Sequence, residues 1–401
     1  MYINKQKPPI IRHLEMVILQ YEIRFRKEFY MSLRDDTLAI LHYQDFKQLP
    51  LVHFGYWTET IWRWRDEGHI SGEDAKNVFD GSPNETKIST KLGFDFNWNT
   101  LFGGNYGLMP HFERKVLEVL PDGHQKELDE NGAVVLMKPG VVSIPSEIDH
   151  LLKDRESWEK HYKHRLAMSD KRIDSGYLKQ FADTSSRQIP IGIHCGSLYG
   201  NVRNYLGVEG SCYLLADDEE LFDEIIDTNA GMMLDVAKAV LETGAKPDYA
   251  HFWEDICFKN GPLISPSVFR EKVGPWYRRF ADLLSGYGID LISIDCDGMI
   301  DSLIPIWLDN GVNVMFPIEV GTWDASIEPW RAKYGRQIRG VGGMNKTCFA
   351  RDYKAIDEEV ERLKRLVDLG GFIPCPDHRI APDAKWENVQ YYCEKLRQAF
   401  R

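Results

Sequence analysis

The sequence predicts a parallel α/β barrel, and three observations lead to that fold class. Short apolar runs recur along the C-terminal half, each run ends in polar residues, and a segment with helical character separates each run from the next. Strand, polar tip and helix in repetition are typical of a (β/α)8 TIM barrel. Such a barrel gathers its strand tips on one face, where its chemistry takes place. Acids, a thiol and a histidine occupy these tips, so an enzyme is the first hypothesis.

Seven of the eight strands that such a barrel needs can be placed from the sequence. Five lie in the C-terminal half, and two earlier runs with the same character precede them; the predicted strands cover residues 49–55, 189–196, 249–253, 291–294, 312–318, 338–341 and 371–374. The eighth strand has no clear signal.

The character of the chain changes between residues 91 and 142, where Gly and Asn are frequent. Alternating segments there are separated by the turn signals Asp122-Gly123 and Asn131-Gly132. Strands joined by such turns make an antiparallel meander. We therefore expect an antiparallel β insertion near residues 91–142, carried by a single barrel domain that spans residues 1–401.

The charge balance limits the partners of this protein. The chain has 49 basic and 61 acidic residues and a net charge of -12, which argues against nucleic acid or an anionic membrane as the main partner. No apolar run approaches the roughly 20 residues that span a bilayer, and the N-terminus has no signal-peptide core. The seven cysteines form no CxxC pair. We expect a cytoplasmic protein with reduced thiols.

Several motifs give the chain a family resemblance. It resembles the uroporphyrinogen decarboxylase superfamily over roughly residues 25 to 400. The resemblance depends on the order and spacing of short stretches, which are Glu254-Asp255-Ile256, Gly261-Pro262-Leu263-Ile264-Ser265-Pro266, Asp295-Cys296-Asp297-Gly298, Pro317-Ile318-Glu319 and Cys375-Pro376-Asp377-His378. The family implies a barrel enzyme that is either a tetrapyrrole decarboxylase or a zinc-dependent, corrinoid-linked methyltransferase.

Residue differences separate these two branches. True decarboxylases carry an N-terminal segment of Arg-Gln-Ala-Gly-Arg type that holds the propionates of the substrate, and this chain has no such segment. The methyltransferase branch binds zinc through a His-x-Cys pair and a later Cys. The matching positions here are Asp295-Cys296-Asp297 and Cys375. The resemblance thus implies a metal, zinc or another divalent ion, at Asp297 and Cys375, and a corrinoid carried by a partner protein.

Polar residues at the predicted strand tips are the candidates for catalysis. Glu254 is favoured as general acid–base over its neighbour Asp255, which would face the opposite way on a strand. Glu319 closes an apolar strand, and His378 has Asp377 beside it to orient its ring. The structural alternatives are a salt bridge for Glu254, a buried ion pair for Glu319 and a purely structural role for His378.

Four further residues are candidates for contacting a substrate. Trp57 belongs to an aromatic cluster near the first strand tip, and Asp295 lies at a later tip; His53 and His194 end two other strands. For the two histidines a role in the core is the alternative, and for Trp57 the alternative is a hydrophobic lid.

The leading hypothesis is a metal-dependent methyltransferase-like enzyme that moves a methyl group between a small methylated substrate and a corrinoid protein or thiol. The first alternative is a decarboxylase acting on a tetrapyrrole or another polycarboxylate. The second is a catalytically lapsed barrel that only binds a ligand. The resemblance leaves a homodimer open, although no interface can be assigned from the residues.

Overall fold

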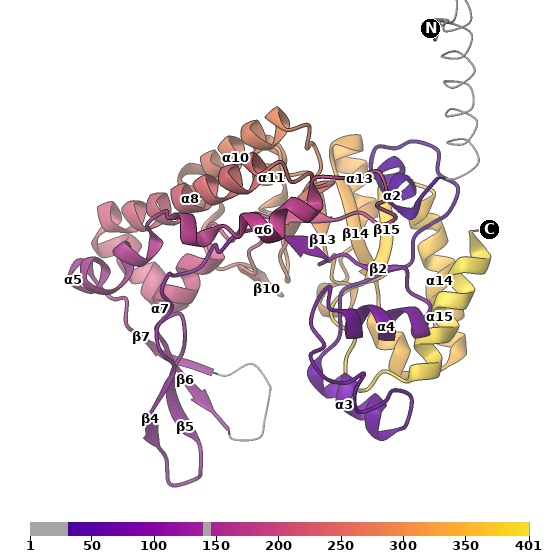
Figure 1. Cartoon of the computed structure of the whole chain (residues 1–401), viewed down its shortest axis with the longest axis horizontal. Helices are drawn as coiled ribbons and strands as arrows, with labels where there is room; N and C mark the ends of the chain where they lie inside the picture. The colour runs from indigo at the N-terminus through magenta and orange to yellow at the C-terminus, as the bar shows by residue number, and fades with distance from the viewer. Residues whose placement is uncertain (1–30, 139–145, 401) are drawn as a thin grey trace, which may run out of the picture.

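Short parallel strands form the wall of a barrel in the computed structural model, which describes residues 31–138 and 146–400 (Figure 1). Every strand position predicted from the sequence is occupied by one of them. The strands of the wall are β1 (Val52–His53), β2 (Phe96–Asn97), β3 (Leu101–Phe102), β8 (Gly192–His194), β9 (Tyr249–Trp253), β12 (Ile292–Asp295), β13 (Val314–Phe316), β14 (Arg339–Met344) and β15 (Phe372–Pro376).

The pairing of these strands follows the order of a (β/α)8 barrel. One sheet has the order β15-β14-β13-β12-β9-β8-β3, and β1 pairs in parallel with β2. A parallel bridge between Tyr56 and Ile380 joins the first strand segment to the chain beyond β15. Because β2 and β3 lie in one short segment, residues 96–102 supply the second strand position of the barrel. The predicted fold class is confirmed.

The antiparallel insertion is present, but its limits differ from the expected 91–142. Its sheet has the order β4-β5-β6-β7 and consists of β4 (Lys115–Val119), β5 (Gln125–Leu128), β6 (Ala133–Met137) and β7 (Ser146–His150). Residues 96–102 belong to the barrel instead, since they pair in parallel with β1 and β8. Strands β2 and β3 have two residues each, which is too short for a hydrophobic alternation to be recognised in the sequence.

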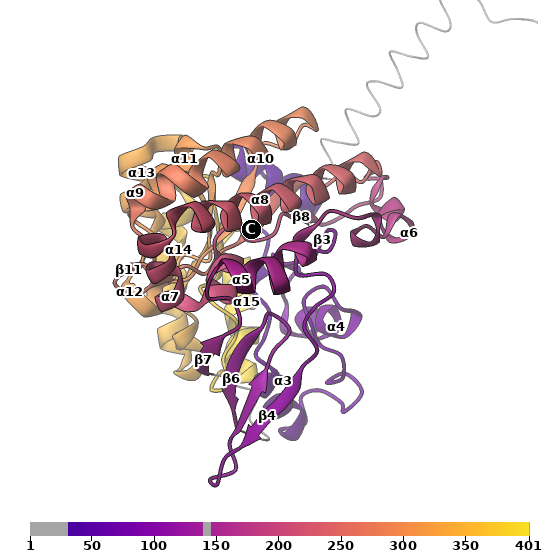
Figure 2. The ribbon, with the colours of Figure 1, turned by 90° about the vertical axis from the view of Figure 1, so that its left-hand side faces the viewer.

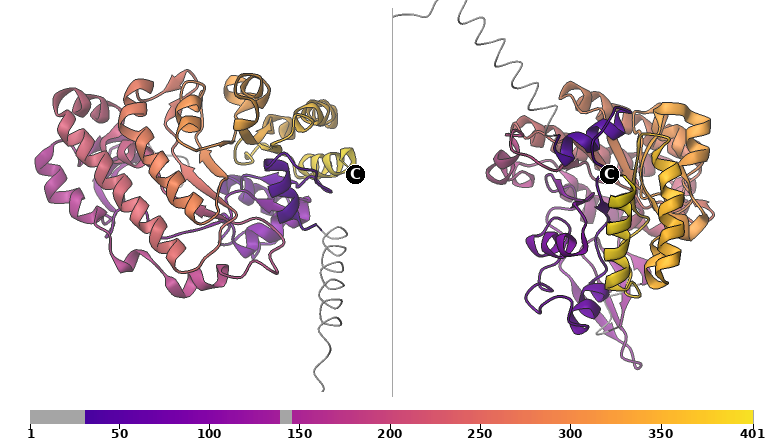
Figure 3. Two further views of the ribbon diagram at one scale, coloured as in Figure 1. Left: turned by 90° about the horizontal axis from the view of Figure 1, so that it is seen from above. Right: turned by 90° about the vertical axis from the view of Figure 1, so that its right-hand side faces the viewer.

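Helices surround the barrel wall, as the view from above in Figure 3 shows. The α-helices are α2 (Leu33–Leu41), α3 (Thr58–Asp66), α4 (Pro83–Leu92), α5 (Arg155–Ser157), α6 (Ser175–Leu178), α7 (Gly200–Asp217), α8 (Glu219–Glu242), α9 (Pro266–Val268), α10 (Gly274–Gly286), α11 (Ile304–Asp309), α12 (Val320–Trp323), α13 (Ile327–Tyr334), α14 (Tyr353–Val367) and α15 (Trp386–Ala399). Short 3-10 and π helices and the two-residue strands β10 (Cys257–Phe258) and β11 (Gly261–Pro262) complete the connections.

Local sequence signals fix the ends of several helices. Ser82 caps α4 by accepting a hydrogen bond from the amide of Glu85, and Pro83 occupies the first turn. Asp218 caps α8 in the same way, through the amide of Leu221. Such caps satisfy amide groups that have no partner within the helix.

Alternation along each strand decides which side chains face the interior of the barrel. On β9, Phe252 packs on Tyr277 and Phe280 of α10, so it faces the helix layer. Tyr249 faces the interior, where its ring stacks on Trp98 with centroids 4.3 Å apart. Because strand side chains alternate with a period of two, His251 and Trp253 share the interior face with Tyr249.

The connections that follow the strands are long at one end of the barrel. Helix α3 and the antiparallel sheet both extend from the lower end in Figure 1, and Figure 2 shows the sheet projecting away from the helices. Both follow the carboxyl end of a barrel strand, so they flank the face on which barrel enzymes carry their active sites. Among the described helices, none is long and apolar enough to cross a membrane.

Candidate functional site

A cluster of titratable side chains lies at the carboxyl ends of the barrel strands. Asp295, Asp297, Glu319 and His378, four of the residues chosen from the sequence, belong to it. The structure adds others from neighbouring tips: Asp80, Arg203, Asp255, Lys346, Asp377 and Arg379. We call this set the strand-tip cluster.

Asp297 and His378 form a close pair within the strand-tip cluster. The Nε2 atom of His378 lies 3.2 Å from Oδ2 of Asp297. Trp57 stacks on the His378 ring at an interplanar angle of 15° and a centroid distance of 5.5 Å. Trp57 thus lies beside His378, and its role as a pocket wall or as a hydrophobic lid stays a prediction.

The backbone determines which nitrogen of His378 carries a proton. The amide N–H of Arg379 donates to Nδ1 of His378 at 2.8 Å. In a neutral ring the proton must therefore be on Nε2, which faces Asp297. The other carboxylate oxygen of Asp297, Oδ1, is buried and has no hydrogen-bond partner among the described residues. No described residue uses that oxygen as a hydrogen-bond acceptor.

Glu319 and Asp377 tie the strand tips together. Glu319 accepts hydrogen bonds from the amide of Gly298 at 2.6 Å and from the hydroxyl of Thr322 at 2.9 Å. Burial and the nearby Asp297 raise the pKa of Glu319. Asp377 accepts from the amides of Val320, Gly321 and Lys346 at 2.9, 2.8 and 3.1 Å, so it connects the ends of β13, β14 and β15.

Glu254 does not join the strand-tip cluster. Its carboxylate accepts hydrogen bonds from the amides of Leu198, Tyr199 and Gly200 at 2.7, 2.9 and 2.8 Å, and from the hydroxyls of Ser197 and Tyr277 at 3.2 and 2.5 Å. This is the start of α7, and a helix N-terminus favours a carboxylate. Although burial raises the pKa of Glu254, its contacts give it a structural task instead of the acid–base role expected from the sequence.

Asp255 is the member of the Glu254-Asp255 pair that reaches the strand-tip cluster. Burial raises its pKa, and the charge of Asp297 adds to that shift. Its Oδ2 atom lies 3.5 Å from Nη2 of Arg203 on α7. Glu254 lies two residues after the outward-packed Phe252 and faces the same helix layer. Asp255 lies beyond β9 with a positive φ of 47°, and its side chain reaches Arg203 instead.

Asp295 lies deeper in the barrel, above two neutral histidines. Its carboxyl is 8% exposed, and Nε2 of His251 lies 3.9 Å from its Oδ2. Burial raises the pKa of Asp295 well above its ordinary value, with Asp297 and Asp255 adding to the shift. Burial lowers the pKa of His194 to about 4 and that of His251 to about 3, so both rings are neutral at pH 7. His194 pairs with His251 in the register of β8 and β9, so it faces the interior, and its contact with a substrate stays a prediction.

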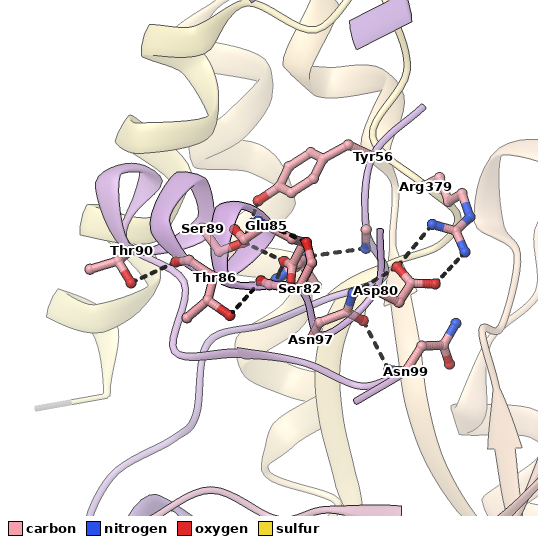
Figure 4. Close-up of polar contacts among 12 residues, drawn as sticks. Tyr56, Asp80, Ser82, Glu85, Thr86, Ser89, Thr90, Asn97, Asn99 and Arg379 are labelled. Carbon is pink, nitrogen blue, oxygen red and sulfur yellow. Dashed lines mark hydrogen bonds and ion pairs between the residues drawn. The ribbon is translucent and has the colours of Figure 1, made fainter. Parts of the chain in front are cut away.

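His53 lies behind the barrel wall, in a separate buried network. Its Nε2 is 2.9 Å from Oε1 of Glu85, and both side chains are buried. Glu85 accepts from Ser89, which in turn is hydrogen-bonded to Tyr56, as Figure 4 shows. The sequence assigned His53 to substrate binding, with a core histidine as the alternative. The pairing with Glu85 supports the alternative.

Arg379 and Asp80 form an ion pair within the strand-tip cluster. The guanidinium binds both oxygens of Asp80, at 3.0 and 2.5 Å, and Asn97 donates to the same carboxylate at 2.9 Å (Figure 4). A Cβ on Gly55 would lie 2.5 Å from Arg379, so glycine is needed for this close approach. Sequence reasoning missed both residues. Arg379 adjoins His378, which was a usable signal, whereas Asp80 comes from a loop with no signal of its own.

The residues expected to hold a metal do not form a ligand set in this structure. Cys375 is fully buried, and that burial raises the pKa of its thiol well above the ordinary value. No group of three or more His, Cys, Asp and Glu side chains within residues 31–138 and 146–400 is arranged to hold a metal ion. The site therefore does not fit the implied zinc as it stands, and a metal at Asp297 and Cys375 stays a prediction.

Comparison with known proteins identifies the family. A profile described as uroporphyrinogen decarboxylase (URO-D) matches residues 190–399, which is more than half of the chain. The protein belongs to the uroporphyrinogen decarboxylase family. No curated protein matches the sequence.

Solved structures share the fold at low sequence identity. A methyltransferase from Methanosarcina mazei is 16% identical, with a TM-score of 0.56 and coverage of 92% of this chain and 99% of that chain. A B12-independent methionine synthase from Shewanella sp. W3-18-1 is 12% identical, with a TM-score of 0.45 and coverage of 88% and 98%. The first similarity supports the fold of this URO-D family member, and the second is too weak to add to it.

Proposed function

We propose that this URO-D family protein is a methyltransferase that moves a methyl group between a small methylated compound and a thiol or a corrinoid carried by a partner protein. The reaction would take place at the strand-tip cluster. The similarity in fold to the methyltransferase from Methanosarcina mazei, which extends over nearly the whole of both chains, is compatible with this function.

The charge balance of the cluster is the observation that carries the proposal. The carboxyl groups are those of Asp80, Asp255, Asp295, Asp297, Glu319 and Asp377, and the basic groups are Arg203, Arg379 and Lys346, whose pKa burial lowers. Arg379 is bound to Asp80 and Arg203 lies beside Asp255. Holding a substrate with several carboxylates requires several converging cations. An acidic site with its arginines already engaged disfavours the decarboxylation of a polycarboxylate.

The Asp297–His378 pair would position the methyl acceptor. Since the Arg379 amide fixes the tautomer of His378, the ring holds Asp297 through one oxygen, and Oδ1 has no hydrogen-bond partner among the described residues. Oδ1 could accept a hydrogen bond from a thiol and so orient its sulfur. Orientation of this kind is a large part of the rate of any group transfer.

Neither the metal nor the corrinoid partner is needed for the contacts described above. A zinc ion bound by Asp297 and Cys375, a corrinoid protein as donor or acceptor, a homodimer and a cytoplasmic location all stay predictions from the sequence.

The proposal can be tested with free methylcobalamin as methyl donor and 2-mercaptoethanol as acceptor. We expect loss of methylcobalamin absorbance with formation of the S-methyl product, at a rate that falls at least about a hundredfold in Asp297→Asn, the range typical for a positioned catalytic group. Asp235→Asn, an exposed carboxylate on α8, is the matched control and should keep the wild-type rate. A chelator added in parallel tests the metal.

Uroporphyrinogen in a parallel reaction tests the decarboxylase alternative. Release of carbon dioxide with porphyrin products of fewer carboxyl groups, and no methyl transfer, would replace the proposal by that alternative. Ligand binding with neither activity would favour a lapsed barrel.

A further inference from the structure

Asp295 stands between two aromatic residues on the interior face of the barrel. In the strand register it pairs with Trp253 on β9 and with Phe316 on β13. Partners in a parallel ladder project from the same face of the sheet. The carboxyl of Asp295 therefore has an aromatic side chain on the neighbouring strand at each side.

The carboxyl of Asp295 is buried without a hydrogen-bond donor. Its side chain is 8% exposed, and no side chain or backbone group of residues 31–138 and 146–400 donates a hydrogen bond to it; the nearest cationic or imidazole nitrogen is that of His251 at 3.9 Å. A buried carboxyl normally receives donors or a counter-charge. Its carboxyl thus lacks a partner that a bound molecule could supply.

Aromatic rings continue around this position. Phe54 packs edge-on against Phe316 with centroids 4.5 Å apart, and the ring of Phe316 also lies 5.7 Å from that of His251. Trp253 is half-buried, and no ring of the described residues packs against its indole. Burial lowers the pKa of His251 to about 3, and the guanidinium whose charge acts on Asp295 is that of Arg379, which is already bound to Asp80.

We propose that the methyl donor is an onium compound, a sulfonium or quaternary ammonium ion, whose positive centre is bound by Asp295 and the neighbouring indole of Trp253. This inference rests on the proposed methyl transfer and names the substrate class for it. Aromatic faces and a carboxylate are the two groups that recognise a cation too crowded by methyl groups to donate hydrogen bonds. The excess of carboxyl groups over basic groups in the strand-tip cluster also favours a positively charged ligand.

An onium donor gives a balanced reaction with a thiolate acceptor. The bond between the methyl carbon and the positive sulfur or nitrogen breaks, and its electron pair stays on that atom, which leaves as a neutral sulfide or tertiary amine. The thiolate sulfur forms the new bond to the methyl carbon. One positive and one negative charge disappear together, so the step needs no oxidant or reductant.

Choline and its neutral carbon isostere, 3,3-dimethylbutan-1-ol, test this inference without any turnover. Calorimetric titration of the full-length protein should show choline binding at least about tenfold more tightly than the isostere, which corresponds to about 1.4 kcal/mol. Asp295→Asn should remove most of that preference, while the control Asp235→Asn should keep it.

Variants of Trp253 provide a second and independent measurement. Trp253→Leu should weaken choline binding several-fold, and Trp253→Phe, which keeps an aromatic face, should recover much of the loss. Equal affinity of the wild type for choline and the isostere would overturn the inference. Displacement of choline by zinc, with zinc binding abolished in Asp295→Asn, would overturn it in favour of a metal.

These outcomes are separate from those of the proposed function. A preference for choline without any methyl transfer would contradict the function and leave the cation site in place. Methyl transfer without a preference for choline would support the proposed function and overturn the cation site.

Discussion

Glu254 and Asp295 are two buried carboxyl groups on neighbouring strands of the same barrel, and they are used in opposite ways. Their backbones are joined by a hydrogen bond from the Glu254 amide to the Asp295 carbonyl, at 2.8 Å. Glu254 receives hydrogen bonds from three amides and two hydroxyls. Asp295 receives none from the described residues. The number of donors distinguishes a carboxyl that holds the fold together from one that is kept available for a ligand.

The difference arises from the direction in which each side chain leaves the sheet. Glu254 lies on the side of Phe252, facing α7 and α10, where helix amides and Tyr277 supply donors. Asp295 lies on the side of Ser293, whose hydroxyl contacts His251 in the interior. The donors around Glu254 stabilise the fold. The unpaired carboxyl of Asp295 lowers stability, which a bound molecule that pairs with it would restore.

Replacing Glu254 should give the largest effect on stability. Glu254→Ala leaves three amides and the Tyr277 hydroxyl buried without an acceptor, and each such group costs about 1–3 kcal/mol. We expect a loss of at least about 4 kcal/mol in the free energy of unfolding, measured by chemical denaturation. Glu254→Gln, which keeps an acceptor oxygen, should lose less. A loss below about 1 kcal/mol for Glu254→Ala would contradict a structural role.

The second prediction tests how closely α7 approaches Glu254. A Cβ on Gly200 would lie 2.1 Å from the carbonyl oxygen of Glu254, which the β-sheet holds in place. Gly200→Ala should therefore cost about 2–3 kcal/mol, as overpacking does in other cores. Gly210→Ala on the same helix is the control, because its Cβ meets nothing nearer than 3.7 Å. Equal stabilities of the two variants would show that the strand and the helix can separate.

Asp295→Asn should raise stability where the Glu254 variants lower it. Burial raises the pKa of Asp295, so the folded chain without a bound cation keeps this proton at pH values where the unfolded chain has released it. The contribution of Asp295 to the free energy of unfolding therefore falls as the pH rises above about 4. Removing the acid should stabilise the protein at pH 7 and flatten this pH dependence. Denaturation curves at pH 5 and pH 7.5 measure it, and a destabilised variant at both would refute it.

The smallest effect concerns the neutral histidine beneath Asp295. Burial lowers the pKa of His251 to about 3, so on acidification the unfolded chain binds a proton that the folded chain does not bind. Stability from this source is complete above about pH 6.5 and is lost as the pH falls toward 3. His251→Gln should remove this loss, a difference below about 1 kcal/mol at pH 6. If the stabilities of the variant and the wild type fall equally on acidification, the ring of His251 lies in a more hydrated site.

The sequence determined the fold class because apolar strands, polar tips and helices recur with a regular spacing. It also selected Asp295, Asp297, Glu319 and His378, since parallel strands bring their carboxyl ends to one face whatever their partners are. Each of these conclusions depends on local patterns that the chain carries without reference to distant residues.

Tertiary structure alone decided the remaining assignments, because they depend on what lies across the sheet. Residues 96–102 became barrel strands only through their pairing with β1 and β8. Glu254 and Asp255 are equivalent in sequence, and the helix packed against Phe252 determines which of them turns outward. Arg379 and Asp80 are 299 residues apart in the sequence, and their contact exists only because the last strand segment of the barrel lies beside the first.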